Sequence, residues 1–127
     1  MAAPHGTAAS ANEVGFTVGT EAGDSITVAV QFKINGVDPA ARTVALCWLS
    51  SDSAGDTVAT DPGTLAVGTD GTILVELTAN LVFLAVSEAD GDLDIAIGHT
   101  STSGFYLNVA PLASGRVFTS PIIQFAA

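Results

Sequence analysis

The chain has few basic residues. Three lysines and arginines stand against 13 aspartates and glutamates, which gives a formal net charge of −10. Proteins bind nucleic acids and anionic membranes mainly through lysine and arginine side chains. We therefore expect neither nucleic acid nor membrane as a partner. A charge of this sign favours protein partners with basic surfaces.

The chain is also poor in cysteine and histidine. Cys47 is the only cysteine, so no internal disulfide can form. It lies within the apolar run 44–49, and we expect a buried, unreactive side chain there. With only two histidines, His5 and His99, a structural zinc site is not expected. We expect His99 to be a solvated loop residue.

Long hydrophobic runs are absent as well. No uninterrupted apolar run reaches the roughly 18 residues that a membrane-spanning helix needs. Residues 1–12 are small or polar and do not resemble a secretory signal, so we expect a flexible N-terminal arm and synthesis in the cytoplasm. Residues 13–127 suit one domain. Their high mean hydropathy, +0.50 for the chain, predicts that a partner covers part of the surface.

Apolar residues alternate with polar or small ones along most of the chain, which is typical of β-strands, and no window carries a helical stripe. Turn signals recur about every ten residues, among them Asn35-Gly36, Asp70-Gly71 and Asp90-Gly91. We interpret Asp70-Gly71 as a hairpin, and the apolar run 43–50 as a central strand covered on both faces. The pattern predicts an all-β antiparallel sandwich of about eight or nine strands. These strands are 14–18, 26–33, 43–50, 64–67, 73–77, 81–86, 93–97, 105–110 and 116–125, with Pro121 marking an edge or a bulge in the last.

The segments 91–97 and 101–107 resemble the passage between strands E and F of immunoglobulin-like domains. The resemblance implies that Tyr106 is the corner tyrosine, whose hydroxyl bonds to backbone upstream, and that Trp48 is the buried tryptophan of strand C. Asn108 stands where such domains have their second cysteine, and strand 25–33 has no cysteine. The implied architecture is therefore an immunoglobulin-like sandwich without its usual disulfide.

A second resemblance covers roughly the C-terminal 60% of the chain. The segments 68–77, 86–94 and 118–126 are similar to a family of small virion proteins of tailed bacteriophages, some proposed as capsid decoration or as head and tail accessory domains. The resemblance implies a virion structural protein, made in the host cytoplasm, that decorates or cements the capsid exterior. The implied partners are the major capsid protein or other virion proteins, with the chain itself a homo-oligomer on the particle.

Two alternatives to capsid decoration remain, a receptor- or carbohydrate-binding tail or fibre module and a neck or tail accessory protein. Catalysis is not expected, because the sequence has no Gly-x-Ser-x-Gly nucleophile elbow. No cofactor is expected either, because its glycines are scattered at turns and none opens a phosphate-binding helix.

One cluster of acidic residues could bind a hard cation such as calcium: Glu88, Asp90, Asp92 and Asp94. Strand alternation places Asp92 and Asp94 on one face, where they could converge with Asp90 or with Asp52 and Asp56 of another loop. The cluster lacks the residue order of an EF-hand loop. We therefore predict a solvated strand face and no metal site, with a calcium site as the first alternative and a docking patch for a basic partner as the second.

Overall fold

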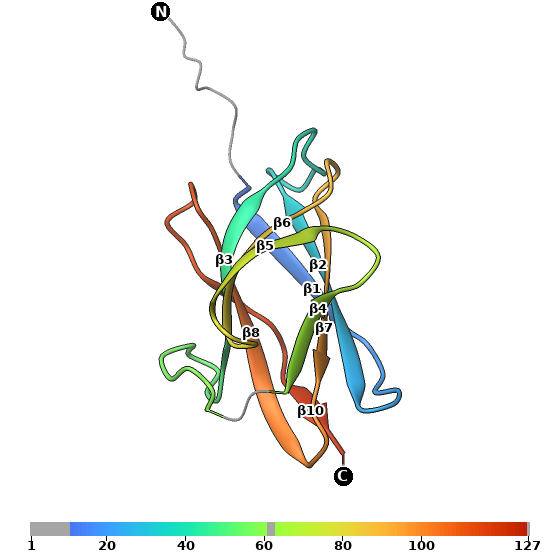
Figure 1. Ribbon diagram of the computed structural model, residues 1–127. Coiled ribbons are helices and arrows are strands. Elements are labelled where there is room, and N and C mark those ends of the chain that lie inside the picture. Colours follow the sequence, from blue (N-terminus) through green and yellow to red (C-terminus); the bar gives the residue numbers. More distant parts are fainter. Residues whose placement is uncertain (1–10, 61–62, 127) are drawn as a thin grey trace, which may run out of the picture.

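The computed structural model describes residues 11–60 and 63–126, which form ten β-strands (Figure 1). No helix in these two ranges has the length and hydropathy that a membrane span requires. The strands are β1 (Glu13–Val18), β2 (Ser25–Lys33), β3 (Val44–Ser50), β4 (Thr64–Val67), β5 (Thr72–Thr78), β6 (Val82–Val86), β7 (Asp92–Gly98), β8 (Ser103–Pro111), β9 (Phe118–Thr119) and β10 (Ile123–Phe125).

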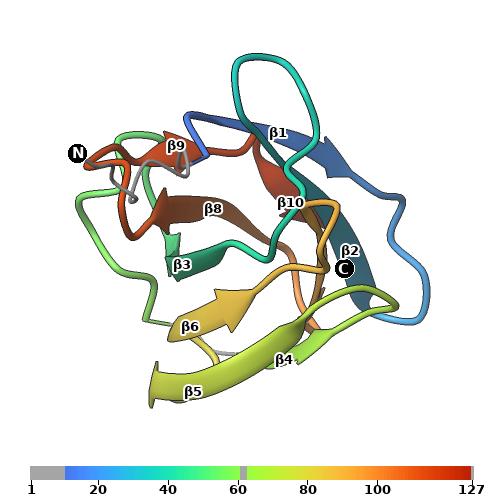
Figure 2. The ribbon, with the colours of Figure 1, turned by 90° about the horizontal axis from the view of Figure 1, so that it is seen from above.

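The strands form two antiparallel sheets that face each other, as the view from above shows (Figure 2). The smaller sheet has the order β1-β2-β7-β4, and the larger has the order β10-β8-β3-β6-β5, with β9 also paired to β8. The prediction of an all-β antiparallel sandwich is confirmed.

Part of the strand order matches that of an immunoglobulin-like domain, in which a sheet of strands A, B, E and D faces one of strands G, F and C. Here β1, β2 and β7 take the places of A, B and E, while β3, β8 and β9–β10 take those of C, F and G. The chain between β3 and β7 differs from the variable-type order. After β3, the chain first forms β4 at the position of strand D in the smaller sheet. It then forms β5 and β6 in the larger sheet, at the positions of strands C″ and C′, with β6 next to β3.

The core lies between the sheets and is built from alternate residues of each strand, because successive side chains of a strand point to opposite faces. β2, for example, buries Ile26, Val28, Val30 and Phe32, and β7 buries Leu93, Ile95 and Ile97. Facing them are buried residues from the larger sheet: Ala45, Cys47, Leu49, Phe83, Ala85, Phe105, Leu107, Val109, Ile123 and Phe125. The expectation that Cys47 is buried is confirmed.

The expectation that β3 is covered on both faces is wrong. Its residues alternate between buried and half-buried, and Trp48 belongs to the half-buried outer face. Trp48 is therefore not the buried core tryptophan that the immunoglobulin resemblance implies. Its indole Nε1 donates a hydrogen bond to the carbonyl oxygen of Gly55, 3.0 Å away, so the ring holds the loop after β3 against the sheet.

The orientation implied for Tyr106 and Asn108 is also wrong. Phe105, Leu107 and Val109 of β8 belong to the core, so Tyr106 and Asn108 point to the other face of the sheet. Within the described ranges the Tyr106 hydroxyl makes no hydrogen bond, and there is no tyrosine corner. A register offset of one residue reverses every side chain of a strand, which explains the difference.

Three further expectations need correction in detail. Asp70-Gly71 is not a hairpin, because the chain crosses there from β4 in one sheet to β5 in the other. The last strand divides into β9 and β10, both paired with β8 at the sheet edge, and Pro121 lies in the gap as expected of an edge position. Of the predicted arm, residues 1–10, including His5, lie outside the described residues. Its end is ordered: Ala11 is buried, and the Asn12 amide donates to the Lys33 carbonyl at 3.0 Å.

Candidate functional site

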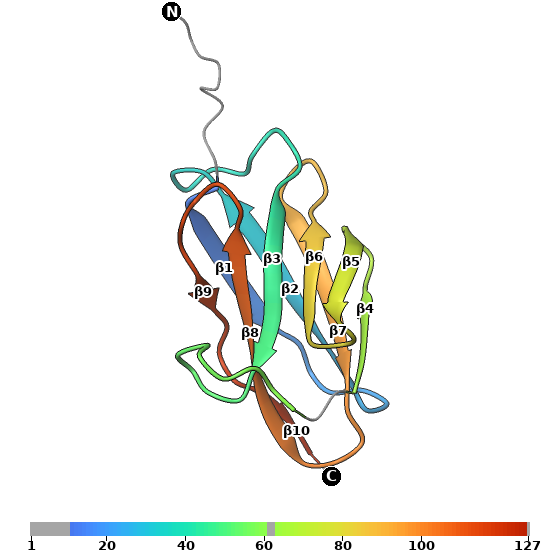
Figure 3. The ribbon, with the colours of Figure 1, turned by 60° about the vertical axis from the view of Figure 1, so that its left-hand side comes forward.

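The most exposed apolar surface of a strand lies on β5, at the edge of the larger sheet. β5 is hydrogen-bonded to β6 on one side; no strand in the described part of the chain pairs with its other side, beside which β4 of the smaller sheet lies (Figure 3). Three aliphatic side chains of β5 are exposed: Leu74 by 53%, Val75 by 45% and Leu77 by 60%. We call these three residues the β5 patch.

Two β-bulges expose the leucines of the patch. Ile73 pairs with Ala85 and Val75 pairs with Leu84, so no residue of β6 stands opposite Leu74. The same irregularity recurs between Glu76 and Thr78 and leaves Leu77 without an opposite residue. Each leucine thereby forgoes part of the roughly 1.5–3 kcal/mol that full burial of such a side chain contributes to folding. A bulge re-aims side chains, and here it turns both leucines outward.

The other sheet edges carry features that protect an edge strand from association. β4 has four residues and β10 has three, which makes both short. β10 also follows Pro121, and the six residues of β1 place Glu13 and Thr17 on the exposed face. Short strands, proline and charge are the usual protective devices. β5 has seven residues and only one charged side chain, Glu76.

Acidic groups lie within the β5 patch and just before the start of β5. Glu76 lies between Val75 and Leu77, and its Oε1 accepts a hydrogen bond from the Asn80 amide at 2.6 Å. Just before β5, the Glu88 carboxylate accepts a hydrogen bond from the Gly71 amide at 2.9 Å, next to Asp70. The patch therefore has one carboxylate within it and two acids, Asp70 and Glu88, beyond the start of β5; we call these three acids its negative rim.

The three basic residues lie on other elements, and each has a contact there. Lys33 of β2 forms an ion pair with Asp38 at 2.8 Å. Arg42 donates to the Ser87 carbonyl oxygen at 3.3 Å. The guanidinium of Arg116 lies 5.0 Å from the centre of the Phe118 ring. None of them belongs to β4 or β5, although Arg42 contacts Ser87, which directly precedes Glu88 of the rim.

The predicted acidic cluster is only partly brought together. Asp92 and Asp94 share the outer face of β7, as alternation predicts, and the Asp92 amide donates to Asp90 Oδ1 at 3.2 Å. Glu88 is instead bonded to the Gly71 amide. Asp52 and Asp56 belong to the loop held by Trp48 on the other sheet. Among the described residues, no three acidic, histidine or cysteine side chains are grouped as metal ligands would be.

Desolvation and, after it, repulsion between neighbouring carboxylates raise the pKa of two acids in this region. Desolvation, together with the nearby charges of Asp94, Glu88 and Asp90, raises the pKa of the Asp70 carboxyl. Desolvation and the charges of Asp90, Asp70 and Asp38 raise the pKa of Asp92 in the same way. The acids of this surface thus repel one another and favour a positively charged neighbour.

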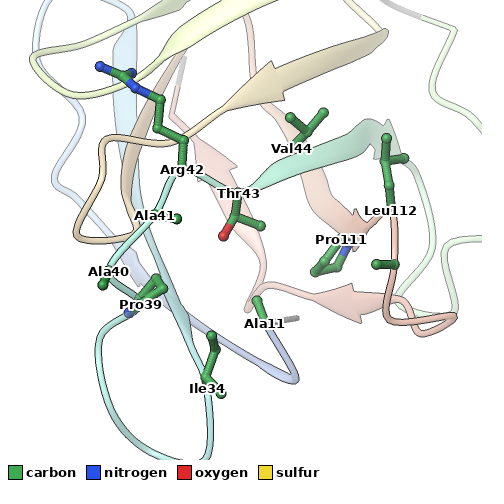
Figure 4. Close-up of a pocket in the computed structure, with 11 residues that line it drawn as sticks. Ala11, Ile34, Pro39, Ala40, Ala41, Arg42, Thr43, Val44, Pro111 and Leu112 are labelled. Atoms are coloured by element: carbon green, nitrogen blue, oxygen red, sulfur yellow. The ribbon is translucent and has the colours of Figure 1, made fainter. Parts of the chain in front are cut away.

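A groove of about 510 Å³ lies at the end of the sandwich where β1 begins (Figure 4). Its walls are mostly aliphatic side chains and prolines from the start of β1, the loop before β3 and the end of β8. Arg42 is its one charged lining residue, and the guanidinium extends away from the groove (Figure 4). Ligand sites of this size normally have several convergent polar groups to orient the ligand. The groove is therefore a weaker candidate than the β5 patch.

Two side chains of types that often act in catalysis, Cys47 and His99, are largely buried. Burial raises the pKa of the Cys47 thiol to about 12, so it stays protonated at neutral pH. His99 is only 6% exposed, and its ring packs against Phe105 and Phe125 at 5.3 and 5.8 Å between centres. The expectation that His99 is solvated is wrong, because the residues that cover it come from β8 and β10.

Comparison of the chain with protein-family models, with curated proteins and with solved structures finds no match. The candidate site therefore rests on the geometry of its own residues. Sequence reasoning placed Leu74 and Leu77 in a regular strand and did not identify them. One feature of the sequence could have indicated an exposed apolar surface here: three consecutive apolar residues, Ile73-Leu74-Val75, precede Glu76 and break the usual alternation of apolar and polar residues.

Proposed function

We propose that this chain is a structural protein of a tailed-bacteriophage particle, bound to the capsid exterior as a decoration or cement protein. Its partner is the major capsid protein or another virion protein, and it acts by binding rather than by catalysis. The observation that carries the proposal is the β5 patch, an exposed aliphatic surface in a chain of net charge −10. The segment 68–77, one of the three that resemble phage virion proteins, contains this patch.

A surface of three side chains supports weak binding by itself. On a capsid the same contact repeats with the symmetry of the shell, and a homo-oligomer that engages several sites gains affinity because its later contacts become intramolecular. The remaining acidic surface keeps the chain soluble before assembly. A small apolar patch on a strongly charged module suits this mode of attachment.

The enclosed state of the reactive side chains supports a binding role. A thiol with a pKa of about 12 is a poor nucleophile at neutral pH, because the thiolate is the reactive form. The His99 ring packs against Phe105 and Phe125, which also contact each other, and the residue is only 6% exposed. These contacts favour a structural use of both residues.

Quantitative mass spectrometry of purified particles tests the proposal, with the major capsid protein as the internal standard. A decoration protein is present in hundreds of copies per particle. A dozen copies or fewer would indicate a neck, tail or fibre position instead, and absence from the particle would refute a virion role. Binding of the isolated chain to a glycan array would favour the carbohydrate-binding alternative.

A further inference from the structure

We propose that the β5 patch binds a different protein by inserting Leu74 and Leu77 into an apolar pocket rimmed with lysine or arginine. The inference assigns the contact surface of the proposed function and rests on that function only for the identity of the partner. It makes two further statements: the contact is formed by side chains rather than by an added strand, and the partner is not a second copy of this chain.

The bulges disfavour strand addition. A strand that joins a sheet edge needs a regular row of amide and carbonyl groups to pair with. β5 has two irregularities within seven residues, at Leu74 and at Leu77, and bulges of this kind interrupt such a row. The edge is thus unsuited to backbone pairing while its leucine side chains remain available.

The same bulges favour side-chain insertion. Each bulged position is occupied by leucine, and each leucine is more than half exposed. Apolar side chains near the centre of a contact contribute most when a pocket of the partner encloses them. Burying the exposed surface of the two leucines in a partner would stabilise the complex through the hydrophobic effect.

The charge of the chain favours a different protein, rather than a second copy of this chain, as the partner of the β5 patch. Glu76 lies inside the patch, and Glu88 is bonded just before β5. Two copies that met through β5 would bring these carboxylates together, and each copy carries a net charge of −10. Like charges at a contact cost free energy, whereas opposite charges steer association and suppress wrong partners. The complementary surface is therefore apolar at its centre and basic at its rim.

Site-specific photo-cross-linking in cells that assemble the particle tests the inference on the full chain. A photoreactive amino acid replaces Leu74 or Leu77, and the control carries it at Leu112, which is 61% exposed and lies beyond β8. Positions 74 and 77 are expected to cross-link to one protein, in a segment with apolar residues flanked by lysine or arginine. Position 112 is not expected to give this product.

Three outcomes would overturn the inference: cross-links between two copies of the chain, the same products from position 112, or no product from either leucine position. If positions 74 and 77 cross-link to a basic-rimmed pocket of a protein that is not part of a virion, the proposed function fails and the patch inference stands. The two proposals can thus fail separately.

A second set of variants measures the contribution of each side chain. In a chain with the photoreactive residue at position 74, Leu77→Ser is expected to lower the cross-link yield about tenfold, because one of the two inserted groups is lost. Glu76→Lys is expected to lower it similarly by reversing the charge of the rim. Leu112→Ser should leave the yield unchanged. Thermal melting of each purified variant shows whether it folds, since all three positions are exposed.

Discussion

Replacement of Asn108 by alanine tests how the outer face of the larger sheet is held together. Asn108 is fully buried in β8, and its side chain bonds to the neighbouring strands β3 and β9. Its Nδ2 donates to Ser50 Oγ at 2.8 Å and to the Trp48 carbonyl oxygen at 3.2 Å. Its Oδ1 accepts a hydrogen bond from Thr119 Oγ1 at 2.8 Å. Asn108→Ala therefore removes the group that joins β3, β8 and β9.

The expected loss of stability follows from these three hydrogen bonds. Each contributes a net stabilisation of about 1 kcal/mol, and a partner left buried without a bond adds a further cost. Ser50 Oγ keeps its hydrogen bond to the Asp52 carbonyl oxygen at 2.8 Å, and Thr119 is partly exposed to water. We therefore expect Asn108→Ala to lower the free energy of unfolding by about 2–4 kcal/mol, out of the roughly 5–15 kcal/mol typical of a domain.

Urea unfolding followed by tryptophan fluorescence measures this loss, because Trp48 is the only tryptophan and pairs with Asn108 across the two strands. Thr119→Val removes one hydrogen bond and is expected to cost about 1 kcal/mol. The double variant should cost less than the sum of the two single variants, since both remove the same bond. A change below about 0.5 kcal/mol for Asn108→Ala, the range of ordinary surface substitutions, would refute the reasoning.

Three further predictions concern pH and backbone conformation. Burial raises the pKa of the Cys47 thiol from 9.0 to about 12, so above pH 9 this thiol ionises in the unfolded chain but not in the folded one. Stability should therefore fall as the pH rises above 9. The fall in the urea midpoint between pH 8 and pH 10 should be smaller for Cys47→Ala than for the unaltered chain. The pKa values of Asp70 and Asp92 are raised above the ordinary 3.8, so the folded chain binds these protons more tightly and their contribution to stability should increase as the pH falls towards 3.8. Asp92→Asn should weaken this dependence in melting curves at pH 4 and 6, and an unchanged dependence would contradict the prediction. Gly91 has a φ of 88°, and a Cβ there would lie 2.6 Å from a backbone carbonyl oxygen of β2, so Gly91→Ala should lower the free energy of unfolding by about 2 kcal/mol or more. Gly23 has a φ of 59° and no atom near its Cβ position, so Gly23→Ala should lower the free energy of unfolding by about 1 kcal/mol. Equal losses for the two variants would show that the close approach at Gly91 is unimportant.

The existence of the strands could be predicted because alternation is a local property of the sequence. β2 and β7 show it most clearly, with buried residues at every second position. Which face of a strand packs against the core depends less on the local sequence. The resemblance implies a core position for Trp48, but Trp48 lies on the outer face, one residue out of register with the core positions of β3.

The candidate site could not be predicted because it depends on contacts between strands. Nothing in the sequence of β5 marks Leu74 and Leu77 as bulged, since a bulge is defined by the pairing of β5 with β6. The burial of His99 likewise depends on Phe105 and Phe125, which follow it in the sequence. The crossing at Asp70-Gly71 was read as a hairpin because the dipeptide signals a turn without indicating which sheet the next strand joins.

We propose that the chain sits on the outside of a capsid with β5 against it. Cryo-electron microscopy of the purified particle can test this placement, because it locates the sandwich and shows its orientation. We expect density for the two sheets on the outer capsid surface, with Leu74 and Leu77 enclosed by a basic-rimmed pocket of a neighbouring protein. Density at the neck or tail, or on the capsid with β5 facing solvent, would contradict it.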